Sequence, residues 1–406
     1  REATAAITQR LAETDVAHAK LYPTFSATGS YTLNQYEVST VDLIPGSANA
    51  AAASPGTVPM DPVIIQPRHQ LDGNLTIQVP IVDFGIWRRL SAAEASSDAT
   101  RAQQRATELE VDNQVYRAYY QLLGQEAVLG ASRRTLDLLR KNLEQVRVKI
   151  EGGTASLLDE QRARAEIARA EGDVAASEFA VVTARRTLST ATYVEPEPAT
   201  GFVDDDLHEE KAIDIWLSYA GSTPRVDAAN AAQHATEKSV AAAEAGWYPT
   251  LNAQAQERFT NASAFTGGRE AVFLLQASLA WKFDFSLPAN VRAQEAAAAV
   301  AHVRTERAQR ATEDSIFTAW HQVRTSIEKA RAARVQIEAS QTAADLARDR
   351  YAAGAATQLD VLQAEQDAFR AQVARIQADT ELVYARASLR ASAGKLSDLP
   401  GERTAP

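Results

Sequence analysis

Two short motifs in this sequence place a carboxylic acid three residues after a hydroxyl, and each motif follows a glycine. The hydroxyl residues are Ser156 and Thr357, the acids are Asp159 and Asp360, and the glycines are Gly153 and Gly354. A hydroxyl and an acid at this spacing cap the first turn of a helix, because each side chain bonds the other's backbone N–H. A glycine just before them ends the preceding helix in the left-handed conformation. The motifs therefore predict the tips of two helical hairpins.

The remaining residues that could do chemistry form no catalytic or metal-binding pattern. The six histidines are His18, His69, His208, His234, His302 and His321, and none has metal-ligand spacing. The acidic run from Asp204 to Glu210 could bind a cation, but a solvated acidic loop is the simpler interpretation. No phosphate-binding loop, nucleophile elbow or HExxH motif is present. We therefore expect no enzyme, no cofactor and no metal.

The bulk properties exclude further classes. The chain has 406 residues, a formal net charge of −10 and no cysteine. Without a basic stripe it is unsuited to displace counterions from phosphates, so we expect no nucleic-acid partner. The lack of cysteine rules out a disulfide framework and a thiolate metal site. No apolar run approaches the roughly 20 residues of a membrane-spanning helix, although alternating barrel strands would escape such a search.

The sequence contains two copies of one pattern of motifs, offset by about 200 residues. Leu21 to Phe25 (Leu-Tyr-Pro-Thr-Phe) reappears as Trp247 to Leu251 (Trp-Tyr-Pro-Thr-Leu), and the two tip motifs correspond in the same order. The copies differ mainly in a long loop from about Glu37 to Arg68, and insertions of this kind belong at exposed loop tips. This period is too long for a solenoid and indicates a duplicated half-subunit.

Four segments alternate with the period of two that is typical of β-strands. They run over residues 25–34, 70–81, 251–259 and 273–285. Five aromatic residues, Tyr22, Trp87, Trp247, Tyr248 and Trp281, lie at or near strand ends, where membrane-interface aromatic belts occur. A soluble antiparallel sheet with one wet face is the alternative. Four strands cannot close a barrel, for which about eight is the practical minimum. A membrane location therefore requires that the chain oligomerise.

Long helical patterns separate the strand pairs. Residues 88–150 contain no proline, and apolar residues recur at three-to-four spacing, which predicts a rod about 90 Å long. The second copy, 290–351, matches it in length. Shorter helices are expected over 156–191, 225–246 and 357–393. Such lengths predict coiled-coil packing in place of a globular core.

These observations give an organisation in eight parts. Residues 1–21 are a helix leading to the barrel, 22–84 are strands one and two with the long loop, 85–192 are the first helical hairpin, 193–224 are an equatorial connector, 225–246 are the second helix leading to the barrel, 247–287 are strands three and four, 288–394 are the second hairpin and 395–406 are a tail. The predicted fold class is mainly α with membrane β: a coiled-coil helical barrel continuing into a transmembrane β-barrel. Because Arg1 lies inside an alanine-rich helical stretch, we expect the protein to begin upstream.

The segment from Tyr351 to Leu362 (Tyr-Ala-Ala-Gly-Ala-Ala-Thr-Gln-Leu-Asp-Val-Leu) resembles the hairpin tip of the outer membrane efflux protein (TolC-like) family. Lys149 to Gln161 is a weaker match, and the Tyr-Pro-Thr entries to strands one and three are also similar. The resemblance covers essentially the whole chain. It implies a homotrimer with four strands per subunit and twelve in total, set in outer-membrane lipid with a long periplasmic extension. It also implies docking to a periplasmic adaptor (membrane fusion) protein and, indirectly, to an inner-membrane pump of the RND or ABC type, for efflux or type I secretion.

The resemblance assigns roles to the tips. Asp360 matches a position that forms an aspartate ring at the periplasmic entrance, although helix capping is an alternative role. The predicted pore constriction comprises Tyr351, Ala356, Asp360 and Gln363. Ala356 and Gln363 depart from the charged residues of the best-known family pattern, so a charge-locked gate is weaker here or built differently. The predicted adaptor contacts are Gly153, Thr154, Ala155, Ser156, Leu158, Asp159, Gly354, Ala355, Thr357 and Leu359.

Two rival functions remain open from the sequence. A periplasmic adaptor should contain one hairpin and small Gly-rich β-domains, whereas two hairpins and two strand pairs are present here. A soluble periplasmic coiled-coil scaffold is the structural rival, and it would need no detergent. The preferred prediction is a passive export duct in the outer membrane of a Gram-negative bacterium.

Overall fold

The computed structural model describes residues 1–39, 63–197, 205–266 and 268–395. Most of the predicted long loop, and the tail after Lys395, lie outside these residues. The described chain divides into two compact units. The first comprises residues 1–101 and 230–303, and the second comprises the remainder.

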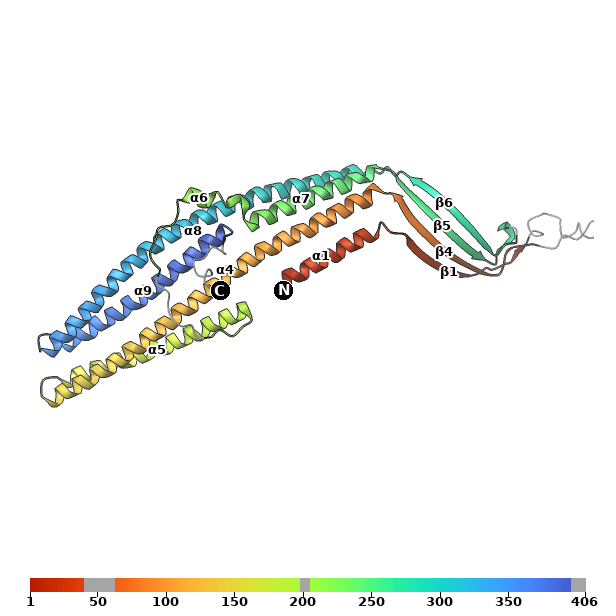
Figure 1. Cartoon of the computed structure of the whole chain (residues 1–406). Coiled ribbons are helices and arrows are strands. Elements are labelled where there is room, and N and C mark those ends of the chain that lie inside the picture. Colours follow the sequence, from red (N-terminus) through yellow and green to blue (C-terminus); the bar gives the residue numbers. More distant parts are fainter. Residues whose placement is uncertain (40–62, 198–204, 267, 396–406) are drawn as a thin grey trace, which may run out of the picture. The chain divides into compact units, whose positions relative to one another are not determined.

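The first unit contains a four-stranded antiparallel sheet (Figure 1). Its strands are β1 (Thr24–Leu33), β4 (His69–Val82), β5 (Thr250–Thr260) and β6 (Ala271–Ala280), in the order β1-β4-β5-β6. Thr28 pairs with Asn74, Thr76 with Gln256, and Gln254 with Gln276. The two copies of the repeat therefore meet between β4 and β5, and β1 and β6 are the sheet edges. A short ribbon, β2 (Val38–Ser39) with β3 (Ile64–Gln66), extends from the β1–β4 side.

The fourth strand is shorter than predicted. It ends at Ala280, so Trp281, Phe283 and Phe285 lie after the sheet and not within it. The alternation of these aromatic residues continues the strand pattern. However, Ala280 already pairs with Thr250, the first residue of β5, so residues after Ala280 have no strand residue of β5 to pair with.

Helices make up most of the rest of the described chain. They are α1 (Glu2–Ala19), α4 (Phe84–Glu151), α5 (Leu157–Thr192), α6 (Ile213–Leu217), α7 (Pro224–Glu244), α8 (Ser286–Ala352) and α9 (Gln358–Ser392), with short 3₁₀ turns at Ala220–Ser222, Ala245–Trp247 and Ala264–Thr266. The 68 residues of α4 and 67 of α8 each make a rod of about 100 Å. Pro288 lies in the first turn of α8, where its missing N–H costs no helical bond. None of the described helices contains a stretch apolar enough to cross a membrane.

The second unit packs its helices through heptad repeats of small and branched residues. In α8 the buried positions Ile316, Val323, Ala330, Ile337 and Ala344 follow one another at intervals of seven residues. In α5 the buried residues Ala163, Ala170, Ser177 and Ala184 do the same. A strict seven-residue repeat keeps one seam facing the partner helix in a left-handed supercoil. The core is therefore an extended seam, as the helix lengths predicted.

Candidate functional site at the hairpin tips and the strand ends

Both hairpins end in the same backbone conformation. Gly153 has φ +73° and Gly354 has φ +76°. The amide of Thr154 donates to the carbonyl of Lys149 at 2.8 Å, and the amide of Ala355 donates to that of Arg350 at 2.7 Å. These bonds satisfy the last carbonyls of α4 and α8. The prediction that the two glycines end their helices in the left-handed region is confirmed.

Both predicted capping boxes are present. The Ser156 hydroxyl accepts from the Asp159 amide at 3.3 Å, and the Asp159 carboxylate accepts from the Ser156 amide at 3.1 Å. Thr357 and Asp360 repeat the arrangement at 3.3 Å and 2.8 Å. Hydrogen bonds from Thr357 hold the pKa of the Asp360 carboxyl below its usual range, and the charge of Arg350 lowers it further. Asp360 is exposed, so capping leaves its charge accessible to solvent.

Tyr351 lies at the contact between the two tips. The Lys149 ammonium donates to the Tyr351 carbonyl oxygen at 2.8 Å, and its Nζ atom lies 3.6 Å from the centre of the Tyr351 ring. Burial raises the pKa of the Tyr351 hydroxyl, and the charge of Asp159 raises it further. That hydroxyl has no hydrogen-bond partner among the described residues. Lys149 thus joins the predicted gate residue to the first hairpin, a contact that the sequence did not reveal.

The other tip residues are mostly exposed. Gln363 is exposed and Ala356 is half-buried. Leu157, Leu158 and Leu359 are 69%, 57% and 49% exposed, although each is a large apolar side chain. Leu158 and Leu359 are among the predicted contacts, and Leu157 lies beside Leu158 at the same tip. Exposed leucines gathered at a hairpin tip are typical of a binding surface.

The aromatic residues near the strand ends gather into two groups in the first unit. Phe84 contacts Trp87 and Tyr248, with ring centres 5.4 and 5.2 Å apart. Phe283 contacts Trp247 at 5.8 Å and Phe285 at 5.7 Å. Trp281 donates from its indole nitrogen to the Trp247 carbonyl at 3.2 Å. Tyr22, at the entry to β1, is exposed, and its ring lies tilted beside that of His18 with ring centres 5.4 Å apart. Phe84 and Phe283 therefore contact three of the five predicted aromatic residues.

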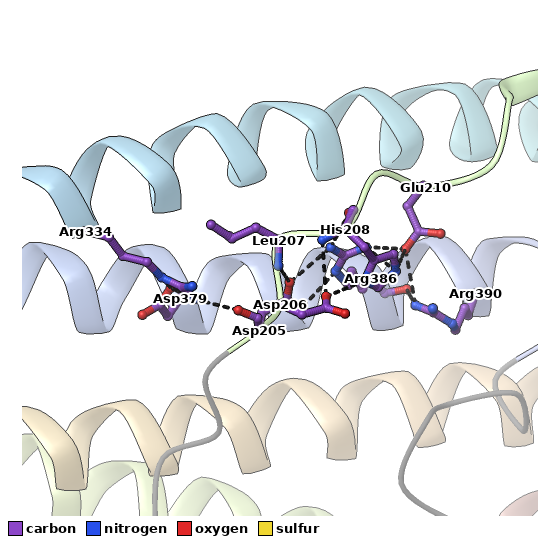
Figure 2. A network of polar contacts seen from close by, with 9 residues as sticks. All are labelled: Asp205, Asp206, Leu207, His208, Glu210, Arg334, Asp379, Arg386 and Arg390. Atoms are coloured by element: carbon purple, nitrogen blue, oxygen red, sulfur yellow. Dashed lines mark hydrogen bonds and ion pairs between the residues drawn. The ribbon is translucent and has the colours of Figure 1, made fainter.

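The prediction of a solvated acidic loop is wrong for Asp205 and Glu210, whose side chains are buried, whereas Asp206 and Glu209 are exposed. The side chains of Asp205 and Glu210 are 9% and 5% exposed, and both pair with Arg386 of α9. One group in the described residues, Asp205, Asp206 and His208, places three potential metal-ligand atoms within 4.8 Å. Arg386 and mutual hydrogen bonds engage those atoms (Figure 2). Asp205 and Glu210 therefore neutralise a buried arginine.

Comparison with known proteins identifies the family. The outer membrane efflux protein family matches residues 1–192 and 219–395, most of the chain. The outer membrane efflux protein BepC of Brucella suis biovar 1 is 25% identical over 327 residues, covering 77% of this chain and 70% of BepC.

Solved structures share the fold. A CusC structure superposes with a TM-score of 0.79 at 18% identity, covering 97% of this chain and 88% of CusC. The Vibrio cholerae outer membrane protein VceC gives 0.75 at 17% identity, covering 97% and 92%. The open-state MtrE outer membrane channel of Neisseria gonorrhoeae gives 0.75 at 19% identity, covering 98% and 86%. These matches do not favour a soluble scaffold or an adaptor. The chain belongs to the outer membrane efflux protein family and is an outer-membrane channel protein with a long periplasmic helical extension.

Proposed function

We propose that this chain is one of three identical subunits of a closed duct, in which the sheets join into a twelve-stranded barrel in outer-membrane lipid. The observation that carries the proposal is the open sheet. The outer sides of the edge strands β1 and β6 have no paired strand among the described residues, and β1 exposes the side chains of both its faces. In lipid, an unpaired edge leaves backbone groups without partners. An antiparallel contact of β6 with β1 of the next copy would pair them.

The geometry of β1 allows a sharp test of this closure. The Asn34 amide donates to the Arg68 carbonyl at 2.8 Å, just past the Leu33–His69 pair. Hydrogen-bonded pairs alternate along an antiparallel ladder, so the N–H of Ala27 points away from β4. Proline is tolerated where an edge N–H faces solvent, but not where that N–H joins a ladder.

We therefore expect Ala27→Pro to reduce the trimer fraction in detergent by roughly tenfold or more, while Ala27→Ser resembles the parent chain. Light scattering measures the mass, and a planar bilayer measures pore formation. A parent protein that is monomeric without detergent, or an Ala27→Pro variant that closes normally, would count against the duct.

We also propose that the hairpin tips dock to a periplasmic adaptor, with an inner-membrane pump of the RND or ABC type beyond it. The exposed apolar residues at the tips, including Leu158 and Leu359, support this. The chain has no cysteine, so Thr154→Cys gives a unique attachment point for a photo-cross-linker. We expect the cross-linker at position 154 to capture the cognate adaptor. The same cross-linker on Arg133→Cys, about 20 residues before the tip on α4, should not capture it. Equal capture from both positions would contradict tip docking. The cargo, small molecules or proteins, would be selected by the pump and adaptor.

The entrance of this duct would be set by Tyr351, Ala356, Asp360 and Gln363. Three copies of Asp360 around a three-fold axis would attract cations. The exposure of Asp360 supports this role, and its capping bonds do not oppose it, because they keep the carboxylate ionised.

A further inference from the structure

The connector between the two copies of the repeat is attached to α9 mainly through one side chain, Arg386, and Arg390 adds a longer ion pair to Glu210 at 3.6 Å. Arg386 donates from Nε to Asp205 Oδ2 at 2.8 Å and from Nη2 to Asp205 Oδ1 at 3.0 Å. From Nη1 it donates to Glu210 Oε1 at 2.7 Å and to His208 Nε2 at 3.0 Å. Its fifth bond runs from Nη2 to the His208 carbonyl at 2.6 Å. A guanidinium has five N–H donors, and all five are used on residues 205–211, which we call the strap (Figure 2).

The contact between Arg386 and the strap is buried. The Arg386 side chain is 6% exposed, comparable with its partners Asp205 and Glu210. Taking a guanidinium and two carboxylates out of water is costly, and only full hydrogen bonding offsets the loss of hydration. If Arg386 is removed, the buried Asp205 carboxylate loses its ion pair. A neutral residue of similar size would fill this space between α9 and the strap more simply, so packing alone does not account for an arginine here.

Further contacts continue the attachment along the strap. Arg334 of α8 donates to the Asp205 carbonyl at 2.9 Å and to the buried Asp379 of α9, also at 2.9 Å. At the other end, the Trp320 indole of α8 donates to the Lys211 carbonyl at 2.9 Å. Between them, Leu207 adopts φ +58° and packs against the α8–α9 core. A non-glycine residue pays strain in that conformation and holds it only when its surroundings impose it.

We infer that Arg386 is a positioning residue that makes the strap a fixed part of the second helical hairpin, so that the connector follows α8 and α9 when they move. The acceptors come from three residues of the strap, and they match the planar fork of a guanidinium and not the compact charge of a lysine. The relevance of this coupling to opening of the duct rests on the proposed function. The attachment itself does not, because it lies within one chain.

Hydrogen exchange of the full chain in detergent tests the inference. Arg386→Met should raise the exchange rate of amides in residues 205–211 by roughly 100-fold, since it removes the ion pair of the buried Asp205 and leaves Glu210 only the longer one with Arg390. Arg386→Lys should raise it less, by roughly tenfold, because it restores the charge but not the fork. The matched control is Arg370→Met on α9, whose guanidinium is exposed beside Asp367, and it should leave the strap unchanged. Protection of the α8 and α9 seams should persist in all three variants.

A second measurement covers the case in which Arg386→Met fails to fold. Asp205→Asn keeps the arginine, and a nitroxide on Glu209→Cys, an exposed strap residue in a chain without other cysteines, reports strap motion directly. We expect an immobilised spectrum in the parent background and a mobile one with Asp205→Asn.

Unchanged strap exchange in Arg386→Lys and an immobile label with Asp205→Asn would overturn the inference, as would a uniform rise in exchange over the whole second unit. A pore-forming trimer with an unprotected strap would refute this inference alone. A protected strap in a chain that forms no pore would refute the proposed function alone.

Discussion

Asp360 can serve both its helix and the duct, and the two roles are separable because only capping needs the Thr357 hydroxyl. Capping needs the hydroxyl of Thr357, which accepts from the Asp360 amide. An entrance ring would need only the carboxylate charge. Thr357→Ala should therefore raise amide exchange in the first turn of α9 by about fivefold and leave cation block unchanged. Asp360→Ala should change both, together with single-channel conductance in planar bilayers. If Asp360→Ala leaves conductance and block as they were, the ring is rejected.

The pH dependence of the same cap follows from the direction of the pKa shift. Thr357 lowers the pKa of the Asp360 carboxyl in the folded protein. The ionised Asp360 carboxylate therefore stabilises the folded state fully above the pKa of an aspartate in the unfolded chain, about 3.9. This stabilisation is lost as the pH falls through the lower pKa of Asp360 in the folded protein. Protection of the first turn of α9, corrected for intrinsic exchange, should be level from neutral pH to about pH 4 and fall below that. Asp360→Asn should abolish this dependence, and a decline beginning near pH 6 would contradict it.

At the scale of helices, close approach depends on small residues. A Cβ atom placed on Gly124 of α4 would lie 2.7 Å from the Thr380 hydroxyl of α9, and that hydroxyl is itself bonded to the Ile376 carbonyl at 2.7 Å. The threonine has little freedom to give way. Gly172 of α5, by contrast, has open space at the same point.

These two glycines should respond to alanine in opposite directions. Gly172→Ala should stabilise the chain by about 1 kcal/mol through helix propensity. Gly124→Ala should destabilise it by about 1–3 kcal/mol through overpacking, and Thr380→Ala should restore most of that loss. The thermal midpoint in detergent measures all three. Stabilisation by Gly124→Ala would show that α4 and α9 are not in close contact there.

At the scale of the whole molecule, the five tryptophans divide between the two compact units. Trp87, Trp247 and Trp281 belong to the unit that contains the sheet, whereas Trp216 and Trp320 belong to the other. If the first three lie at the membrane interface, brominated lipids should quench single-tryptophan variants that retain one of them. Variants that retain Trp216 or Trp320 should keep their emission. Equal quenching of all five, or of none, would contradict the predicted aromatic belt.

The sequence by itself determined the features that depend on neighbours along the chain. The glycine ends of α4 and α8, the capping boxes at Ser156 and Thr357, and the long helices, whose ends fall within a few residues of the predicted ranges, all arise from contacts within one or two turns. The duplication could be recognised from the sequence for the same reason: the two copies contain the same local motifs in the same order. Period-two alternation located the strands but overextended the last one, since it cannot tell when the partner strand has ended.

Only the tertiary structure decided what joins distant parts of the chain. Asp205 and Arg386 are 181 residues apart in sequence, Lys149 and Tyr351 are 202 apart, and no local pattern links either pair. The one available signal for Arg386 was a charged residue beside the apolar positions Leu382 and Leu389 of α9. Charge patterning predicted a solvated loop, because it reports only the preference of charged side chains for water. Whether such side chains are buried depends on whether folding brings an opposite charge within hydrogen-bond distance.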